Sequence, residues 1–309
     1  MSLIRNITAL LLPFILSLDG SAQSEPLFMD SYPDTLNRKR LTWVITGQGA
    51  LYASSMTALY YAWYKDYPQS NFHWIDDGDE WMQIDKIGHA TTAAYAGKFG
   101  YEFYRWAGVE RKKAIWIGGS VGFIYLTTIE ILDGFSAEWG ASAWDLISNA
   151  AGTGLFIGQQ LAWDEQRFLL KWSYHETEYA QYRPEILGSG FFERMLKDYN
   201  GQTYWLSANI SSFVRRDSRV PSWLNISFGY GADGMIGAKS NPKEIDGRPV
   251  PGFPRYRRYF LSLDIDLSRI RTRSNFLSFV FHSFNFLKIP FPALEYNDHQ
   301  GLGFHWLYF

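Results

Sequence analysis

Four long apolar segments occupy the first half of the chain and are separated by short polar connections. They are Leu41–Tyr64, Asp85–Trp106, Ala114–Leu132 and Ser142–Trp163. Segments of this length with few charges form helices that bury an apolar stripe against one another. The pattern predicts a four-helix bundle over residues 41–163.

The hydrophobic period changes to two after Gly201, as expected where helices give way to strands. In the clearest segment, Leu261 and Leu263 alternate with Ser262 and Asp264, which predicts a strand with one wet face. The predicted strands are Thr203–Val214, Trp223–Gly231, Tyr259–Ile270 and Leu302–Phe309. Residues 201–309 are therefore expected to form an antiparallel β region, and the fold class is α+β.

Residues 164–200 join the two parts and are predicted to be a helical connector. A helix is expected as far as about Tyr182, followed by a break at Pro184 and a short helix over Phe191–Lys197. Further along, Phe276–Leu287 fits either a strand or an amphipathic helix. Asn241–Pro254 is rich in Pro and Gly and is expected to be a loop.

The N-terminal 24 residues have the organisation of a secretory signal peptide. Arg5 precedes the apolar stretch Ile7–Leu18, and Gly20-Ser21-Ala22 offers small residues before a cleavage point near Gln23. The alternative is an uncleaved anchor helix, for which this stretch is short. Residues 25–40 are then a polar linker.

Composition narrows the class of partner. The chain is 18% aromatic, and Trp and Tyr favour half-wet surfaces such as membrane interfaces. A net charge of -2 gives no indication of a nucleic-acid partner, and a mean hydropathy of -0.20 is too polar for a chain mostly buried in lipid. The absence of cysteine excludes disulfides, thiolate metal sites and a lipidated N-terminal Cys.

The basic residues before the first predicted helix and the predicted signal peptide imply opposite orientations of that helix relative to the membrane. Leu41–Tyr64 is long enough to cross a bilayer, and positive-inside logic would place the preceding Arg38-Lys39-Arg40 in the cytoplasm, whereas a cleaved signal places it outside. We favour the signal peptide, which predicts a cell-envelope protein of the periplasm or outer membrane. Its expected partner is a membrane lipid or another envelope protein. The alternative is a bundle in the inner membrane.

Polar residues mark one end of three of the predicted helices. If consecutive helices are antiparallel, the start of the second, the end of the third and the start of the fourth lie together. Within each helix the polar residues are three or four positions apart and share a face. The set is Asp85, His89, Glu130, Asp133, Asp145 and Asn149.

Three interpretations of this polar set remain open. Carboxylates and an imidazole could hold a divalent metal or another ligand. His89 and Glu130 could serve as an acid–base pair, with burial raising a carboxyl pKa. The residues could instead be structural, with Asp85 as a helix N-cap, Ser142-x-x-Asp145 as a capping box, and Asn149 hydrogen-bonded to His89. The sequence contains no Walker, GxSxG, HExxH or dinucleotide motif.

The ordered motifs Asp85-Lys86-x-x-His89, Glu130-x-x-Asp133 and Ser142-x-x-Asp145-x-x-x-Asn149-x-x-Gly152 resemble the YfiM-like family of predicted periplasmic lipoproteins. They are similar, more loosely, to VanZ-like membrane proteins. The resemblance covers about residues 85–163 and implies an envelope protein without a settled biochemical role. Two features depart from these families: the chain has no Cys for a lipid anchor, and Asp133 stands where VanZ-like chains often carry an amide.

Overall fold

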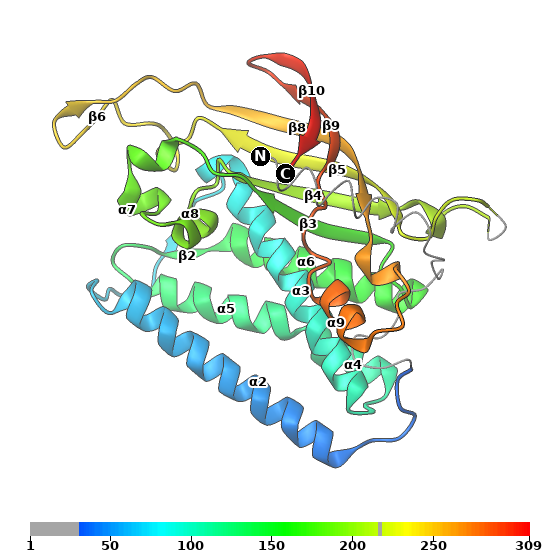
Figure 1. Ribbon diagram of the computed structural model, residues 1–309. Coiled ribbons are helices and arrows are strands. Elements are labelled where there is room, and N and C mark those ends of the chain that lie inside the picture. Colours follow the sequence, from blue (N-terminus) through cyan, green and yellow to red (C-terminus); the bar gives the residue numbers. More distant parts are fainter. Residues whose placement is uncertain (1–30, 216–217) are drawn as a thin grey trace.

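The computed structural model describes residues 31–215 and 218–309 and shows an α+β architecture, as the sequence predicts. A layer of helices lies against one face of an antiparallel sheet, and α3 runs between the sheet and the remaining long helices (Figure 1). The predicted signal peptide and residues 25–30 of the linker lie outside the described residues.

The four apolar segments of the first half are helical. The helices are α2 (Arg38–Leu59, continued by a π-helical turn over Tyr60–Tyr64), α3 (Ile84–Trp106), α4 (Arg111–Gly119), α5 (Val121–Gly134) and α6 (Ala143–Trp163). The single helix predicted over Ala114–Leu132 was wrong in one respect, because it is divided at Ser120 into α4 and α5. The described residues therefore contain more helices than the four that the sequence predicted.

Close backbone contacts fix α3 at the centre of this layer. A Cβ on Gly152 of α6 would lie 1.9 Å from the Ala90 carbonyl oxygen, and one on Gly122 of α5 would lie 2.3 Å from that of Ala93. Only glycine permits such an approach. α2 is different: Val44 is its one buried residue, and the helix follows the outer edge of the layer (Figure 1).

The main sheet has the strand order β10-β9-β8-β5-β4-β3, and every neighbouring pair is antiparallel. Its strands are β3 (Phe168–Tyr174), β4 (Gln202–Asn209), β5 (Leu224–Asp233), β8 (Tyr256–Ile265), β9 (Phe291–Asn297) and β10 (Gly301–Tyr308). The four predicted strands are present, but two of them are shorter than predicted. β4 ends at Asn209, whose side chain caps a 3-10 turn, and β8 ends at Ile265, before a 3-10 turn over Leu267–Arg269. β9 was not predicted.

The helix expected to run from residue 164 to Tyr182 was wrong, because β3 occupies much of that span. Lys171 explains the error: its charge suggests a solvated helix face, yet the side chain is fully buried. Its ammonium lies 2.9 Å from the Asp264 carboxylate and donates to the Ile265 carbonyl at 2.6 Å. Pairing with distant β-strands thus overrides the local pattern.

The remaining elements are short. α7 (Pro184–Leu187) begins at the proline expected to break the chain, and the predicted helix α8 (Phe191–Lys197) is confirmed. The ambiguous segment is helical as α9 (Asn275–Ser283). The predicted loop contains the small hairpin β6 (Glu244–Ile245) and β7 (Arg248–Pro249). β1 (Trp74–Ile75) pairs in parallel with β2 (Ala141–Ser142), which fixes the connection before α3 against the start of α6.

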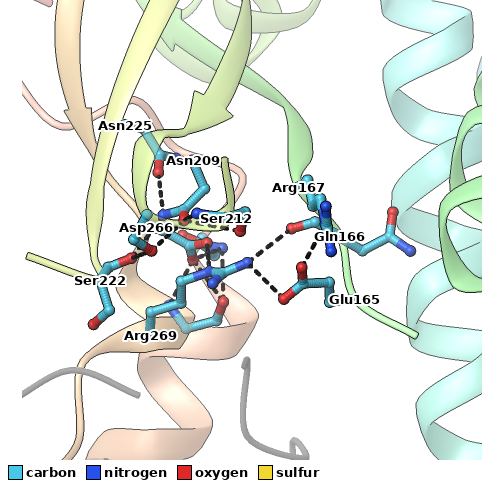
Figure 2. Close-up of polar contacts among 12 residues, drawn as sticks. Glu165, Gln166, Arg167, Asn209, Ser212, Ser222, Asn225, Asp266 and Arg269 are labelled. Atoms are coloured by element: carbon cyan, nitrogen blue, oxygen red, sulfur yellow. Dashed lines mark hydrogen bonds and ion pairs between the residues drawn. The ribbon is translucent and has the colours of Figure 1, made fainter. Parts of the chain in front are cut away.

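A buried polar network joins the end of the helical layer to the sheet. The Arg269 guanidinium donates to Asp266 at 3.0 Å, to Glu165 at 3.5 Å and to the Gln166 carbonyl at 3.4 Å (Figure 2). Asn209 of β4 donates in turn to the Ser222 carbonyl at 2.6 Å. Since Arg269 is only 1% exposed, these partners compensate the cost of burying its charge and hold the two layers in register.

Candidate functional site

The polar residues at the ends of α3, α5 and α6 meet as the antiparallel topology predicts. The His89 Nδ1 atom lies 3.1 Å from the Asn149 amide oxygen, which fixes the imidazole if Nδ1 carries the proton. The Nε2 atom then faces two carboxylates, 3.9 Å from Asp85 Oδ1 and 3.8 Å from Asp145 Oδ1. The hydrogen bond expected between His89 and Asn149 is confirmed.

Lys86, next to Asp85 in the motif, places an ammonium in the middle of the cluster. It contacts Asp77 and lies 3.1 Å from Asp85 Oδ2 and 2.9 Å from Asp145 Oδ2. Asp145 Oδ1 is also only 2.8 Å away, but it is not aligned to accept a hydrogen bond. Burial alone would lower the pKa of Lys86, but the charges of Asp85 and Asp145 raise it above its ordinary value.

Ser142 connects the start of α6 to the other helices. Its hydroxyl accepts the Asp145 amide at 3.1 Å, which confirms the predicted cap, and donates to Asp77 at 2.6 Å. Its own amide donates to Glu130 Oε2 at 3.0 Å. Glu130 is consequently 3% exposed and is bound by backbone rather than facing open space.

Asp133 lies at the edge of the cluster. Its carboxylate accepts a 2.6 Å hydrogen bond from the Tyr64 hydroxyl, in the π-helical turn that follows α2. Burial raises the pKa of Asp133 to about 6, against the effect of that hydrogen bond. This residue therefore joins α5 to the end of α2 and is less central than its position in the motif suggested.

The cluster contains more negative than positive groups. Five carboxyl groups, those of Asp77, Asp85, Glu130, Asp133 and Asp145, share one ammonium and one imidazole. Burial raises the pKa of Glu130 to about 7, with a further contribution from the charge of Asp145, and raises that of Asp145 to about 6. Burial would lower the pKa of His89, but Asp85 and Asp145 raise it. The site is thus short of positive charge.

One subset has the geometry of a cation site. One atom each from Asp85, His89 and Asp145 lies within 4.8 Å of the others. The side chains of Asp85 and His89 are 24% and 19% exposed, so a ligand can reach them, whereas Asp145 is 7% exposed. Asn149 is fully buried, and its amide nitrogen has no hydrogen-bond partner among the described residues.

A cavity of about 670 Å³ opens beside this subset, between α3 and the sheet. Asp85 and His89 line one end of it. Glu130, the other residue expected to act in acid–base chemistry, does not line it.

One expectation about an individual residue needs correction, and several partners were missed. Asp85 is not the N-cap of α3, since Gln83 takes that position in a left-handed conformation. Lys86 and Asp77 were visible as charges but not as members of the site. Tyr64 and Tyr199, whose hydroxyl donates to Asp85 at 2.7 Å, carry no sequence signal because they arrive from distant segments.

Together the residues form a carboxylate–histidine site where three helix ends meet, beside an apolar cavity. No family model, no curated protein and no solved structure matches the chain.

Proposed function

We propose that this chain is an exported cell-envelope protein that acts as a binding component at the membrane surface. Its site holds a divalent cation between Asp85, His89 and Asp145. The observation that carries the proposal is the convergence of these three ligand atoms within 4.8 Å. His89 is oriented for this role by Asn149, as metal-binding histidines are oriented by a hydrogen bond at the other ring nitrogen.

The distances from His89 to the two carboxylates fit a small divalent ion. Bonds of about 2.0–2.2 Å to nitrogen and oxygen allow two ligand atoms to lie up to about 4 Å apart across one ion. His89 Nε2 lies 3.9 Å from Asp85 Oδ1 and 3.8 Å from Asp145 Oδ1, within that limit. One imidazole with two carboxylates suits Zn²⁺ or Mn²⁺. A divalent ion would also supply the positive charge that the carboxylates lack.

The envelope location rests on the N-terminal signal pattern and on exposed apolar surface. Trp43 and Leu51 of α2 are 73% and 69% exposed, and Ile124 of α5 is 57% exposed. Among the described residues, only the stretch Arg111–Gly134 is long and apolar enough to cross a membrane, and such a helix also occurs in soluble cores. We take residues 41–163 as one helical bundle, related to the YfiM-like family, whose partner is a membrane lipid or an envelope protein.

A second candidate function is a hydrolase or transferase that acts on an envelope lipid or glycan. The observation that favours it is the position of His89 at the cavity, where its Nε2 atom is available as a general base. Glu130 does not fit the acid's role, since it is buried and accepts the Ser142 amide.

The cation site is tested by titrating the EDTA-treated full chain with Mn²⁺ and Zn²⁺ in a calorimeter. We expect one ion per chain, and about tenfold or greater weakening in His89→Ala and in Asp145→Asn. The matched control is His299→Ala, which removes an exposed imidazole outside the cluster. Equal affinity in wild type and His89→Ala would contradict the proposal.

A further inference from the structure

We propose that the cavity beside the cation site binds the hydrocarbon tail of a single-chain amphiphile whose anionic head, a phosphate or a carboxylate, meets the cation. The position of the head rests on the function proposed above, whereas the position of the tail rests on the cavity alone. The ligand class is therefore a lipid with one long chain, and it is not a glycan.

The cavity is long and follows a single face of α3. Asp85, Gly88, His89, Thr92, Ala96 and Phe99 line it, and their spacing places them on one side of the helix. At 1.5 Å per residue, the distance from Asp85 to Phe99 along the helix is about 21 Å. The polar residues Asp85 and His89 lie at the start of this path. An amphiphile with its head there would extend its tail toward Phe99.

The opposite wall is apolar and comes from distant parts of the chain. It consists of Leu126 of α5, Trp172 of β3, Leu196 of α8, Tyr204 of β4 and Phe286. The volume of about 670 Å³ lies within the range of pockets that bury most of a small ligand.

The polar atoms of the lining decide between a hydrocarbon and a sugar. The Tyr199 hydroxyl already donates to Asp85 at 2.7 Å, that of Tyr204 to Gln202 at 2.8 Å, and that of Thr91 to the Ile87 carbonyl at 2.8 Å. The Gln202 amide donates to the Met195 carbonyl at 3.1 Å. Tyr95 also lines the cavity, and its buried hydroxyl has no hydrogen-bond partner among the described residues. Because the other hydroxyls and the amide are engaged within the protein, a glycan would find few partners for its hydroxyls along these walls, whereas a hydrocarbon needs none.

The charge of the site specifies the head. Without a divalent ion, the carboxyl groups of the cluster outnumber the Lys86 ammonium and the His89 imidazole, so the site repels an anionic head. A bound divalent ion adds two positive charges beside the Lys86 ammonium, and its open positions accept oxygen ligands. We therefore expect the head to bind only when the metal is present, while an ammonium head would show the opposite dependence.

The test is a binding titration of the full chain with octyl, decyl and dodecyl phosphate, with and without Mn²⁺, followed by tryptophan fluorescence. Each added methylene should tighten binding about threefold to fourfold until the cavity is full. Ala96→Trp, which fills the cavity, should weaken dodecyl phosphate about tenfold or more while Mn²⁺ affinity is unchanged. The control Ala162→Trp, at an exposed position of α6, should bind as wild type.

The outcomes separate the two proposals. Affinity that does not rise with tail length, or wild-type affinity in Ala96→Trp, overturns the tail site even if Mn²⁺ binds. Tail-dependent binding that needs no Mn²⁺, or equal binding of dodecyltrimethylammonium, overturns the metal-bound anionic head but leaves the tail site standing. If Ala96→Trp does not fold, Thr92→Trp takes its place, because Thr92 lines the cavity yet is exposed. Dodecanoate, used beside dodecyl phosphate, shows which anion the site prefers.

Discussion

Glu130→Gln should stabilise the protein at neutral pH, although it changes a buried residue in the middle of the motif. The substitution removes the negative charge and keeps an oxygen that can accept the Ser142 amide, which Glu130 now accepts at 3.0 Å. Glu130 is 3% exposed, so its charge is poorly solvated, and Asp145 adds repulsion. The backbone hydrogen bond therefore survives while the unfavourable charge is lost.

The magnitude follows from the pKa of Glu130, which burial raises from 4.5 to about 7. At 1.36 kcal/mol per pH unit, this difference corresponds to about 3 kcal/mol. The folded protein binds this proton more tightly than the unfolded chain does. The resulting stability is fully present below pH 4.5 and is lost as the pH rises through about 7. Glu130→Gln should thus match wild type near pH 4 and exceed it by up to about 3 kcal/mol above pH 7.

The assay is urea unfolding of wild type and Glu130→Gln at intervals from pH 4 to pH 8, without added metal. Glu138→Gln is the matched control, since Glu138 is exposed in the loop just beyond α5, and its unfolding should follow wild type throughout. A Glu130→Gln protein that is less stable than wild type at pH 7–8 would refute the reasoning. It would mean that the charge of Glu130 is needed by Lys86 or His89, as in a purely structural network.

Three further predictions concern the bundle and the N-terminus. Lys86→Met leaves Asp77, Asp85 and Asp145 without the ammonium that they share, and it should lower the free energy of unfolding by about 3–5 kcal/mol. If the variant loses less stability when Mn²⁺ is added, the ion has replaced the ammonium. Gly152→Ala should lower the free energy of unfolding by about 1–3 kcal/mol, because the new Cβ would lie 1.9 Å from the Ala90 carbonyl oxygen. The control is Gly154→Ala on the same helix, which has open space around it and should leave stability unchanged or raise it by up to about 1 kcal/mol. Equal losses in the two variants would contradict the packing argument. N-terminal sequencing of the mature protein should begin close to Gln23, whereas an intact Met1 in the cytosolic fraction would contradict export.

Much of the helical layer could be predicted because its signals are local. The Ser142 hydroxyl caps α6 by accepting the amide of Asp145, three residues later. Asp85, His89 and Asn149 come together because neighbouring helices are antiparallel. Each of these features depends on spacing within one helix or on the order of consecutive helices. The candidate site was therefore visible in outline before the structure.

The errors come from long-range contacts that no local pattern contains. Lys171 resembles a solvated helical residue, but Asp264, on a strand that follows much later, makes its burial possible in β3. The Ser142 amide that donates to Glu130 was likewise not visible in the sequence, and the acid–base role of Glu130 stays a prediction. Tyr199 and Trp172 lie far from α3 in the sequence, so the cavity that they help to line had no sequence signal.

The cation site is tested most directly by anomalous scattering from crystals of the full chain grown with Mn²⁺. The account predicts one strong peak bounded by the carboxylates of Asp85 and Asp145 and by Nε2 of His89, at about 2.0–2.3 Å from each. The peak should be absent from crystals of Asp145→Asn grown in the same way. A wild-type map without a peak at this position, with Lys86 still paired to Asp77, Asp85 and Asp145, would contradict the account.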